Sequence, residues 1–449
     1  MTGPLALLVP LLALTFAAAP ALAPAGKPGA RTLSLAQAVA IAGGSSPAVQ
    51  VATLVTDEAS AGVRESRGVL LPSLSGTASQ LDHTFNSRAL GIPFPSAPGG
   101  GSIPDRIGPV QQFDTRLRAS QSVLDPADWE RMGASRHRLD ASRADRGVSA
   151  EAAAQAAAIA YLRAARAQTV VDARRSDLAL ADSLVGIAEA QIKAGLAPHV
   201  DGTRARTQRA SAQGALLVAR NQLDRARIDL ARALGLDPMG ALALSDSLDT
   251  SLGGSTAPDE PEAAVSLAIG RRPELAAESA RARLAESSRR AIQLERVPRM
   301  DVAADYGLSG EHATDAIATR QVSVAVTVPL FDGMRREARV DEQTALLRES
   351  EVRERDIREQ IVADVNAALL DLASGMEQQR VATDRLQLAD EELSQATERF
   401  TSGVAGNIEV IDAQSSLVRA RDVDIDARFA IALARVNLAR AVGVAQSIH

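Results

Sequence analysis

The chain has 449 residues, of which 46% are apolar, 23% charged and only 2% aromatic, and its formal net charge is -6. Ordinary globular cores draw much of their buried area from Phe, Tyr and Trp, so this composition favours close-packed helices over a sheet sandwich. The lack of cysteine excludes disulfides, Cys-ligated metals and thiol catalysis, and the acidic balance argues against a nucleic-acid binder.

Residues 1–26 carry no charged side chain, and an apolar run from Leu5 to Ala19 is followed by small residues up to Ala25. This pattern predicts a secretory signal peptide over residues 1–25, and its prolines argue against the alternative of a membrane anchor. Because no Cys is present for acylation, the exported protein is expected not to be lipidated. No later apolar run approaches the ~20 residues of a spanning helix, so any membrane-spanning part is expected to consist of strands.

The rest of the chain has the pattern of a duplication. Ala38-Val39 and Pro47 recur with the same spacing as Ala264-Val265 and Pro273, and the pattern of residues 178–182 recurs at 386–390. These matches predict a first repeat over residues 26–246, a linker over 247–261 and a second repeat over 262–449. Each repeat is expected to contain a helix, a β-hairpin (residues 73–123 and 299–331) and long helices.

Two long stretches without proline run from Trp129 to Ala194 and from Leu330 to the C-terminus. Helix formers dominate both, and an uninterrupted helix of ~65 residues would be ~100 Å long. This length exceeds the usual globular range and predicts long antiparallel helical hairpins in a coiled-coil-like assembly. A single solvent-exposed helix is the alternative, but the apolar stripe needs a partner.

Between the helical stretches, apolar and polar residues alternate, which is typical of strands. The alternation is clear over 113–120, 300–309 and 321–330, and it is weaker over 73–82. Strands of ~10–12 residues have the length that a transmembrane barrel requires, whereas a soluble hairpin capping a helical bundle is the alternative. In a membrane, the residues expected to face lipid are Phe113, Leu117, Val302, Tyr306, Val322, Val324, Val326 and Val328. Four strands cannot close a barrel and open edges do not occur in lipid, so a spanning protein must oligomerise.

Three features spread over the whole mature chain indicate a known family: the duplicated halves, Pro72 and Pro298 at the start of the hairpins, and the Pro-Leu-Phe-Asp-Gly signature at 329–333. It resembles the TolC-type outer-membrane efflux channels. The resemblance implies a mainly helical fold with transmembrane β structure: a homotrimer in which four strands per protomer form one closed β-barrel of twelve strands, and the helical hairpins form an α-barrel.

The function that this resemblance implies is a passive channel in the outer membrane of a Gram-negative-type bacterium, extending into the periplasm. It would be the exit duct of a tripartite efflux or type I secretion system. The implied partners are outer-membrane lipid, a periplasmic adaptor protein and an inner-membrane transporter. The alternative is a periplasmic coiled-coil adaptor (membrane fusion) protein without a channel, although such a protein would carry one helical hairpin rather than two in tandem.

The resemblance also assigns adaptor binding to two helix-to-helix turns. One consists of Ala194, Gly195 and Leu196, and the other of Ser402, Gly403 and Val404. A glycine supplies the left-handed residue that ends a helix, and a small tip lets another backbone approach. Simple helix caps without any binding role are the alternative.

An acidic ring at the tunnel entrance is implied at Glu409, Asp412 and Asp201. Because Glu409 and Asp412 are three residues apart, both carboxylates lie on one helix face. Threefold symmetry would gather them in a narrow mouth that attracts cations. The alternative is that these acids only stabilise a helix N-terminus.

Family members close the entrance through a basic residue and a tyrosine near the counterpart of Asp201. Here the corresponding positions are Ala405 and Phe400, which supply neither a cation nor a hydroxyl. Arg204 and Arg206 are therefore expected to act as gate partners by pairing with Glu409 or Asp412.

No catalytic, cofactor or metal motif is present, and the five His residues are scattered without metal-ligand spacing. The sequence therefore predicts a non-enzyme without a cofactor or nucleic-acid partner. The exported substrate is not encoded in any motif, because a passive duct takes its specificity from its pump.

Overall fold

A computed structural model describes residues 31–90, 105–249, 251–404 and 406–449. The predicted signal peptide, the glycine-rich part of the loop after residue 90 and Ala405 lie outside the described residues. The first half comprises β1 (Arg31–Leu33), α1 (Leu35–Ser45), α2 (Pro47–Val69), β2 (Ser73–Asn86), η1 (Ser87–Leu90), β3 (Arg106–Leu124), α3 (Pro126–Lys193), α4 (His199–Ala233) and β4 (Leu242–Leu244). The second half comprises α5 (Pro261–Arg271), α6 (Pro273–Leu294), β5 (Arg299–Gly310), β6 (Ile317–Thr327), α7 (Arg335–Thr401), α8 (Asn407–Val442) and η2 (Ala445–Ser447).

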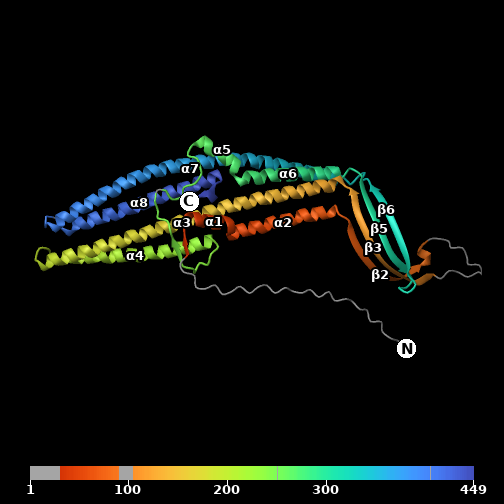
Figure 1. Cartoon of the computed structure of the whole chain (residues 1–449), viewed down its shortest axis with the longest axis horizontal. Coiled ribbons are helices and arrows are strands. Elements are labelled where there is room, and N and C mark those ends of the chain that lie inside the picture. Colours follow the sequence, from red (N-terminus) through yellow and green to blue (C-terminus); the bar gives the residue numbers. More distant parts are fainter. Residues whose placement is uncertain (1–30, 91–104, 250, 405) are drawn as a thin grey trace, which may run out of the picture.

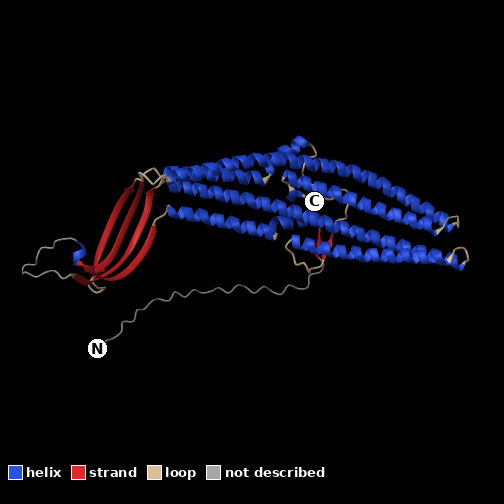
Figure 2. Ribbon diagram, turned by 180° about the vertical axis from the view of Figure 1, so that it is seen from behind, coloured by secondary structure: helices blue, strands red, loops and turns tan. Residues whose placement is uncertain are grey.

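The molecule is elongated, with a β-sheet at one end and two helical hairpin tips at the other (Figures 1 and 2). The long helices α3 and α7 have 68 and 67 residues, which correspond to roughly 100 Å each. α3 begins three residues before the predicted stretch, where the Asp125 side chain accepts hydrogen bonds from two N–H groups of the first turn. The predicted mainly helical fold with long hairpins and a four-stranded sheet is confirmed.

The helices form a single curved layer. In the half near the tips, α4 packs on α3, α3 on α8 and α8 on α7, whereas in the half near the sheet α2 packs on α3, α3 on α6 and α6 on α7 (Figure 1). α7 is therefore at one lateral edge of the layer, and α2 and α4 are at the other. The central core is built largely from small side chains; fully buried alanines of α3 are Ala154, Ala157, Ala158 and Ala164. Small residues let long helices approach closely.

The segment Leu35–Val69 is, by length and composition, apolar enough to cross a membrane, which corrects the expectation that no such helical stretch follows the signal. Pro47 divides this segment into α1 and α2. One face of α1 is buried in the core against α3, where Leu35, Ala38, Val39 and Ala42 have no exposed surface, whereas Ala36 and Ala40 are exposed. Core packing therefore accounts for the hydropathy of α1.

The predicted linker is packed against the helices. Leu248 and Leu252 are buried, and the N–H of Gly253 donates to the carbonyl of His449 over 3.0 Å. β4, just before the linker, pairs in parallel with β1. The described residues of the linker thus pack against both halves at the middle of the molecule.

The sheet has the order β2-β3-β5-β6, and all its pairs are antiparallel. The second hairpin has strands of 12 and 11 residues, as the alternation predicts, but β2 and β3 have 14 and 19 residues. β3 begins at Arg106 and passes through Pro109, before the clear alternation that starts at residue 113. Pairing with β2 extends this strand beyond its region of clear alternation.

Candidate functional site

The β-sheet has one apolar and one polar face. The register places Leu117 opposite Tyr306, Val302 opposite Val324 and Phe113 opposite Gly310, and directly opposed residues share a face. All residues predicted to face lipid within the strands therefore lie on one side of the sheet, and Val328 follows directly after β6. Among them, the side chains of Leu117, Tyr306, Val322, Val324, Val326 and Val328 are 48% to 74% exposed.

Within the regularly paired stretches, residues 73–83 with 110–122 and 301–310 with 317–326, charge on this apolar face is confined to Asp82 and Arg320, toward the strand ends distant from the helices. The opposite face carries hydroxyls and charges; its residues include Ser75, Thr77, Asp114, Arg116, Arg118, Asp301, Asp305 and Ser323. This two-sided pattern is that of a sheet between lipid and water.

An ion-pair network crosses the polar face. Arg116 of β3 binds Asp114 on its own strand, with Nε 2.6 Å from Oδ1, and Asp305 of β5, with Nη1 2.9 Å from Oδ1. Gly307 lies opposite Arg116, and a Cβ at this position would be 2.4 Å from the Cβ of Arg116. The glycine therefore leaves room for the arginine where it crosses to β5.

The two hairpin tips end in the same way. Gly195 and Gly403 have φ of 71° and 73°, the left-handed region that favours glycine. At each tip the following residue returns its N–H to a carbonyl of the last helical turn: Leu196 to Gln191 and Val404 to Arg399, both over 2.9 Å. This is the Schellman motif.

The predicted tip residues are solvent-exposed. A Cβ at Gly195 or Gly403 would meet nothing within 4 Å, so the positive φ and not internal crowding accounts for the glycines. Leu196 and Val404 are 80% and 72% exposed. Each tip therefore presents one exposed apolar side chain at the same position of its turn.

The predicted entrance acids occupy different environments. Asp412 is exposed, and Glu409 binds Arg399 of α7, with its Oε2 3.2 Å from Nε. Asp201 is only 8% exposed, near the start of α4. The three acids are therefore not exposed together in one chain. Asp201 is buried where the starts of α4 and α8 lie side by side, whereas Glu409 and Asp412 are exposed.

The predicted gate pairs do not form within the chain. Arg204 binds Asp201, one turn earlier on α4, at 3.3 Å, and Nε of Arg206 donates to the carbonyl of Gly202 over 3.2 Å. Among the described residues, neither arginine contacts Glu409 or Asp412. Arg204 and Asp201 are three residues apart and therefore neighbours on one face of α4, which accounts for their pairing. Phe400 is buried in the α7–α8 core, and Ala405 lies outside the described residues.

Two amide side chains that the sequence did not single out connect the tips. Nε2 of Gln191 donates to the carbonyl of Phe400 over 3.2 Å, and Nδ2 of the buried Asn407 donates to the carbonyl of Asp201 over 3.1 Å. They join the α3–α4 hairpin to the α7–α8 hairpin without charge. No sequence pattern would have identified them, because each reaches a backbone group on a distant segment.

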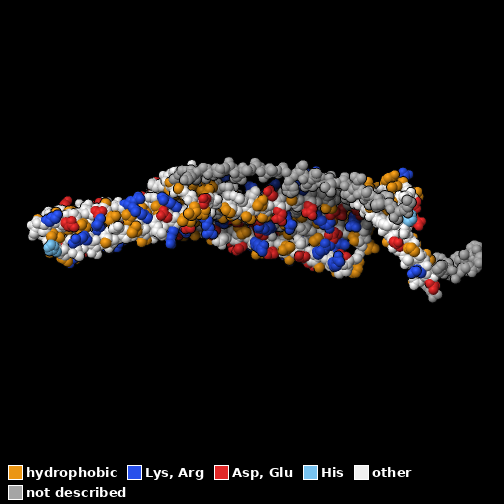
Figure 3. Space-filling model, turned by 90° about the horizontal axis from the view of Figure 1, so that it is seen from below, with side chains coloured by type: hydrophobic (Ala, Val, Ile, Leu, Met, Phe, Trp, Pro, Cys, Tyr) orange, Lys and Arg blue, Asp and Glu red, His pale blue; other side chains and the backbone are white. Residues whose placement is uncertain are grey.

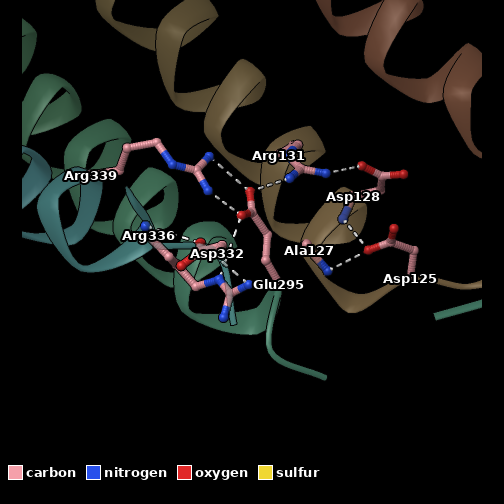
Figure 4. A network of polar contacts seen from close by, with 8 residues as sticks. All are labelled: Asp125, Ala127, Asp128, Arg131, Glu295, Asp332, Arg336 and Arg339. Atoms are coloured by element: carbon pink, nitrogen blue, oxygen red, sulfur yellow. Dashed lines mark hydrogen bonds and ion pairs between the residues drawn. The ribbon is translucent and has the colours of Figure 1, made fainter. Parts of the chain in front are cut away.

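A second polar network lies where the strands give way to the helices (Figure 4). Glu295, at the C-terminal end of α6, accepts hydrogen bonds from Arg131 of α3 over 2.6 Å and from Arg339 of α7 over 3.1 Å. Burial acts to raise the pKa of Glu295, but the hydrogen bonds from Arg339 and Arg131 outweigh it and lower the pKa. The network connects both halves of the chain below the sheet.

In the described part of the chain, no cluster of three or more His, Asp or Glu side chains is arranged to hold a metal ion. The candidate functional surfaces of the described chain are therefore the two-faced sheet and the two exposed tips, with polar networks between them.

A family model described as outer membrane efflux protein matches residues 39–236 and 264–444. No curated protein matches the chain. Among solved structures, that of CusC aligns with a TM-score of 0.75 at 18% identity, covering 91% of this chain and 92% of CusC.

The CmeC outer membrane channel of Campylobacter jejuni aligns with a TM-score of 0.76 at 15% identity, covering 92% of this chain and 86% of CmeC. The open state of the Neisseria gonorrhoeae MtrE outer membrane channel aligns with a TM-score of 0.74 at 17% identity, covering 91% and 89%. At these identities the likeness concerns the fold.

Proposed function

Since this chain belongs to the outer membrane efflux protein family, we propose that it is a passive homotrimeric channel that spans the outer membrane and extends through the periplasm. It is the exit duct of a tripartite efflux or type I secretion system. Its partners are a periplasmic adaptor at the tips and an inner-membrane transporter. The observation that carries the proposal is the sheet with one apolar face and two open edges, joined directly to helices of roughly 100 Å.

The open edges support oligomerisation. β2 and β6 are the edge strands, and neither pairs with a further strand in the described part of the chain. In hydrocarbon each unpaired backbone group costs several kcal/mol, so only a closed barrel is tolerated. Pairing β6 of one copy with β2 of the next satisfies both edges at once.

The helical layer supports the same head-to-tail arrangement. The helices at both lateral edges carry exposed apolar side chains, each 59% to 71% exposed: Val51 and Leu54 of α2 and Leu217 of α4 at one edge, and Leu370 and Leu388 of α7 at the other. Seen from the α2 and α4 side, apolar side chains are interspersed with charged ones (Figure 3). When two different surfaces of identical copies bind each other, the copies form a closed ring if the rotation from one copy to the next adds up to a full turn.

Three copies would contribute twelve strands, an even number within the range of outer-membrane barrels. The apolar face would then contact lipid and the Arg116 network would line the lumen. The exposed tips would lie at the far periplasmic end, where Leu196 and Val404 are available to an adaptor. Asp412 and Glu409 would ring the entrance nearby.

The test is the behaviour of the protein expressed with its leader in a Gram-negative host. We expect outer-membrane fractionation, heat-modifiable migration of a trimer, and ion conductance in planar bilayers. Recovery as a soluble periplasmic monomer would instead favour an adaptor protein without a channel.

A further inference from the structure

The turn between β6 and α7, residues 328–334, exposes a group of large apolar side chains. Leu330, Phe331 and Met334 are 90%, 79% and 61% exposed. Gly333 and Met334 both have positive φ, and Met334 is the one described non-glycine residue in that region. A left-handed conformation costs roughly 1 kcal/mol or more for such a residue. The turn that exposes these apolar side chains is therefore also a site of backbone strain.

A polar network holds this edge turn (residues 328–334) in place. Oδ2 of Asp332 accepts the backbone N–H of Arg336 over 3.2 Å, and the Arg336 guanidinium is buried between Asp332 and Glu295 at 3.6 and 3.9 Å (Figure 4). The exposed side chains are therefore carried on an anchored backbone. Their exposure is a feature of the folded chain.

The corresponding junction of the first half has no such turn. β3 ends at Leu124, and Asp125 caps α3 directly without positive φ. β3 lies inside the sheet between β2 and β5, whereas β6 is an edge strand. Among the described residues, the turn with positive φ and exposed Leu, Phe and Met side chains thus lies at the junction where the next copy would join, although Val123 and Leu124 at the first junction are also 49% and 40% exposed.

Strand direction determines what faces the edge turn across that joint. β2 begins next to α2 and runs away from the helices, and β6 runs back toward them (Figure 1). With antiparallel pairing throughout, β6 of one copy brings its helical end beside the start of β2 in the next. The exposed apolar residues there are Val69 and Leu71, both 55% exposed.

Exposed charges of opposite sign lie near these residues, together with the exposed Arg335 at the start of α7. Arg67, one turn before Leu71, is exposed, as are Asp341 and Glu342 in the second turn of α7. Within the described residues none of the three forms an ion pair. Because α2 and α7 would run antiparallel across the joint, Arg67 would meet the acidic turn of α7.

We propose that the edge turn is a seal between protomers: Leu330, Phe331 and Met334 of one copy pack on Val69 and Leu71 of the next copy, where barrel and helices meet. This rests on the proposed ring of identical copies. The exposed apolar side chains of the edge turn would thus contact a second copy of this chain and not lipid.

The natural absence of cysteine permits a direct test. In the double variant Leu71→Cys with Phe331→Cys, oxidation should produce covalent dimers and trimers on non-reducing gels. The two positions lie at opposite edges of the sheet, so a bond within one copy is excluded. The matched control, Leu117→Cys with Phe331→Cys, pairs the turn with an inner strand and should remain monomeric under the same treatment.

Depth measurement separates the seal from a lipid contact. In a Trp129→Phe background, the indole of a Phe331→Trp variant should resist quenching by brominated phospholipids, whereas that of Val324→Trp on the apolar face should be quenched. An intact trimer that gives no covalent products, and in which the Phe331→Trp emission is quenched, would overturn the seal and leave the channel function standing. A protein that is monomeric in every assay would overturn both.

Discussion

The hydroxyl of Tyr161 lies 3.0 Å from Oδ2 of Asp246 and 2.9 Å from the carbonyl oxygen of Leu33, and the tyrosine has no exposed surface. Oδ2 of Asp246 also accepts the N–H of Leu35, at the start of α1, over 2.7 Å. One buried side chain in the middle of α3 thereby connects the N-terminal segment with the chain that leads into the linker. These hydrogen bonds connect the two segments at the middle of the molecule.

Tyr161→Phe should lower the stability of the fold. Removal of the hydroxyl deletes its two hydrogen bonds, to Asp246 and to Leu33. Each acceptor keeps another donor, Leu35 or Ser245, so we expect a loss of about 1–2 kcal/mol. The matched control is Tyr306→Phe, in which the hydroxyl lost belongs to an exposed side chain of the sheet. Thermal unfolding followed by circular dichroism should shift only for Tyr161→Phe, and equal midpoints for the two variants would contradict this.

Titration of Tyr161 should be displaced to high pH. Burial raises the pKa of Tyr161 from 10.0 to about 12. Since the folded pKa is the higher one, the stabilisation is complete below pH about 10 and is lost as pH rises through about 12. In the Tyr306→Phe variant, Tyr161 is the remaining tyrosine, and tyrosinate absorbance should rise near pH 12 in the folded protein; a midpoint near 10 before unfolding would show the opposite.

Glu295→Gln should loosen the junction between sheet and helices. The arginines that bind Glu295 are 47% and 44% exposed, so solvent screening limits the expected loss to about 1 kcal/mol. Because hydrogen bonds from Arg339 and Arg131 lower the pKa of Glu295 despite its burial, its contribution is present above the ordinary pKa of 4.5 and disappears as pH falls through the lowered value.

The wild type should therefore lose more stability in acid than Glu295→Gln does. Glu286→Gln is the matched control, because Glu286 pairs with Arg290 on the exposed side of the same helix. Unfolding midpoints at neutral and acidic pH for the three proteins decide the matter. Parallel acid losses in wild type and Glu295→Gln would remove the role assigned to this carboxylate.

Charged substitutions at the tips should separate docking from channel formation. Leu196→Asp and Val404→Asp change exposed side chains beyond the helix caps, so trimers and bilayer conductance should persist while adaptor co-purification falls. Lys193, the only lysine after Lys27, lies beside the first tip and allows amine-directed cross-linking. Lys193→Arg is the control that should abolish the cross-link; retained adaptor binding in both Asp variants would rule out the tips as the docking site.

Removal of single acids at the entrance should have unequal effects on ion selectivity. Glu409 is already paired with Arg399, whereas Asp412 is exposed. Asp412→Asn should therefore reduce cation preference and block by divalent ions more than Glu409→Gln does. Reversal potentials in planar bilayers measure the difference. A larger effect of Glu409→Gln would mean that its pair with Arg399 does not persist in the assembled channel.

Features that depend on local periodicity were predictable from the sequence. The lengths of α3 and α7 follow from stretches without proline, and the common face of Leu117, Tyr306 and Val324 follows from alternation with period two. The tip glycines are also local, because a left-handed residue is needed wherever these helices turn back. Such signals lie within a few residues of one another.

Contacts between distant segments were decided by the tertiary structure alone. Arg131 and Glu295 are 164 positions apart, and Asn407 donates to the backbone carbonyl of Asp201, 206 positions away. β3 extends through Pro109 because β2 pairs with it, and the apolar character of α1 serves the core. No local pattern contains these outcomes, since they depend on how the helices and strands are laid against one another, which brings some charges together and moves others out of reach.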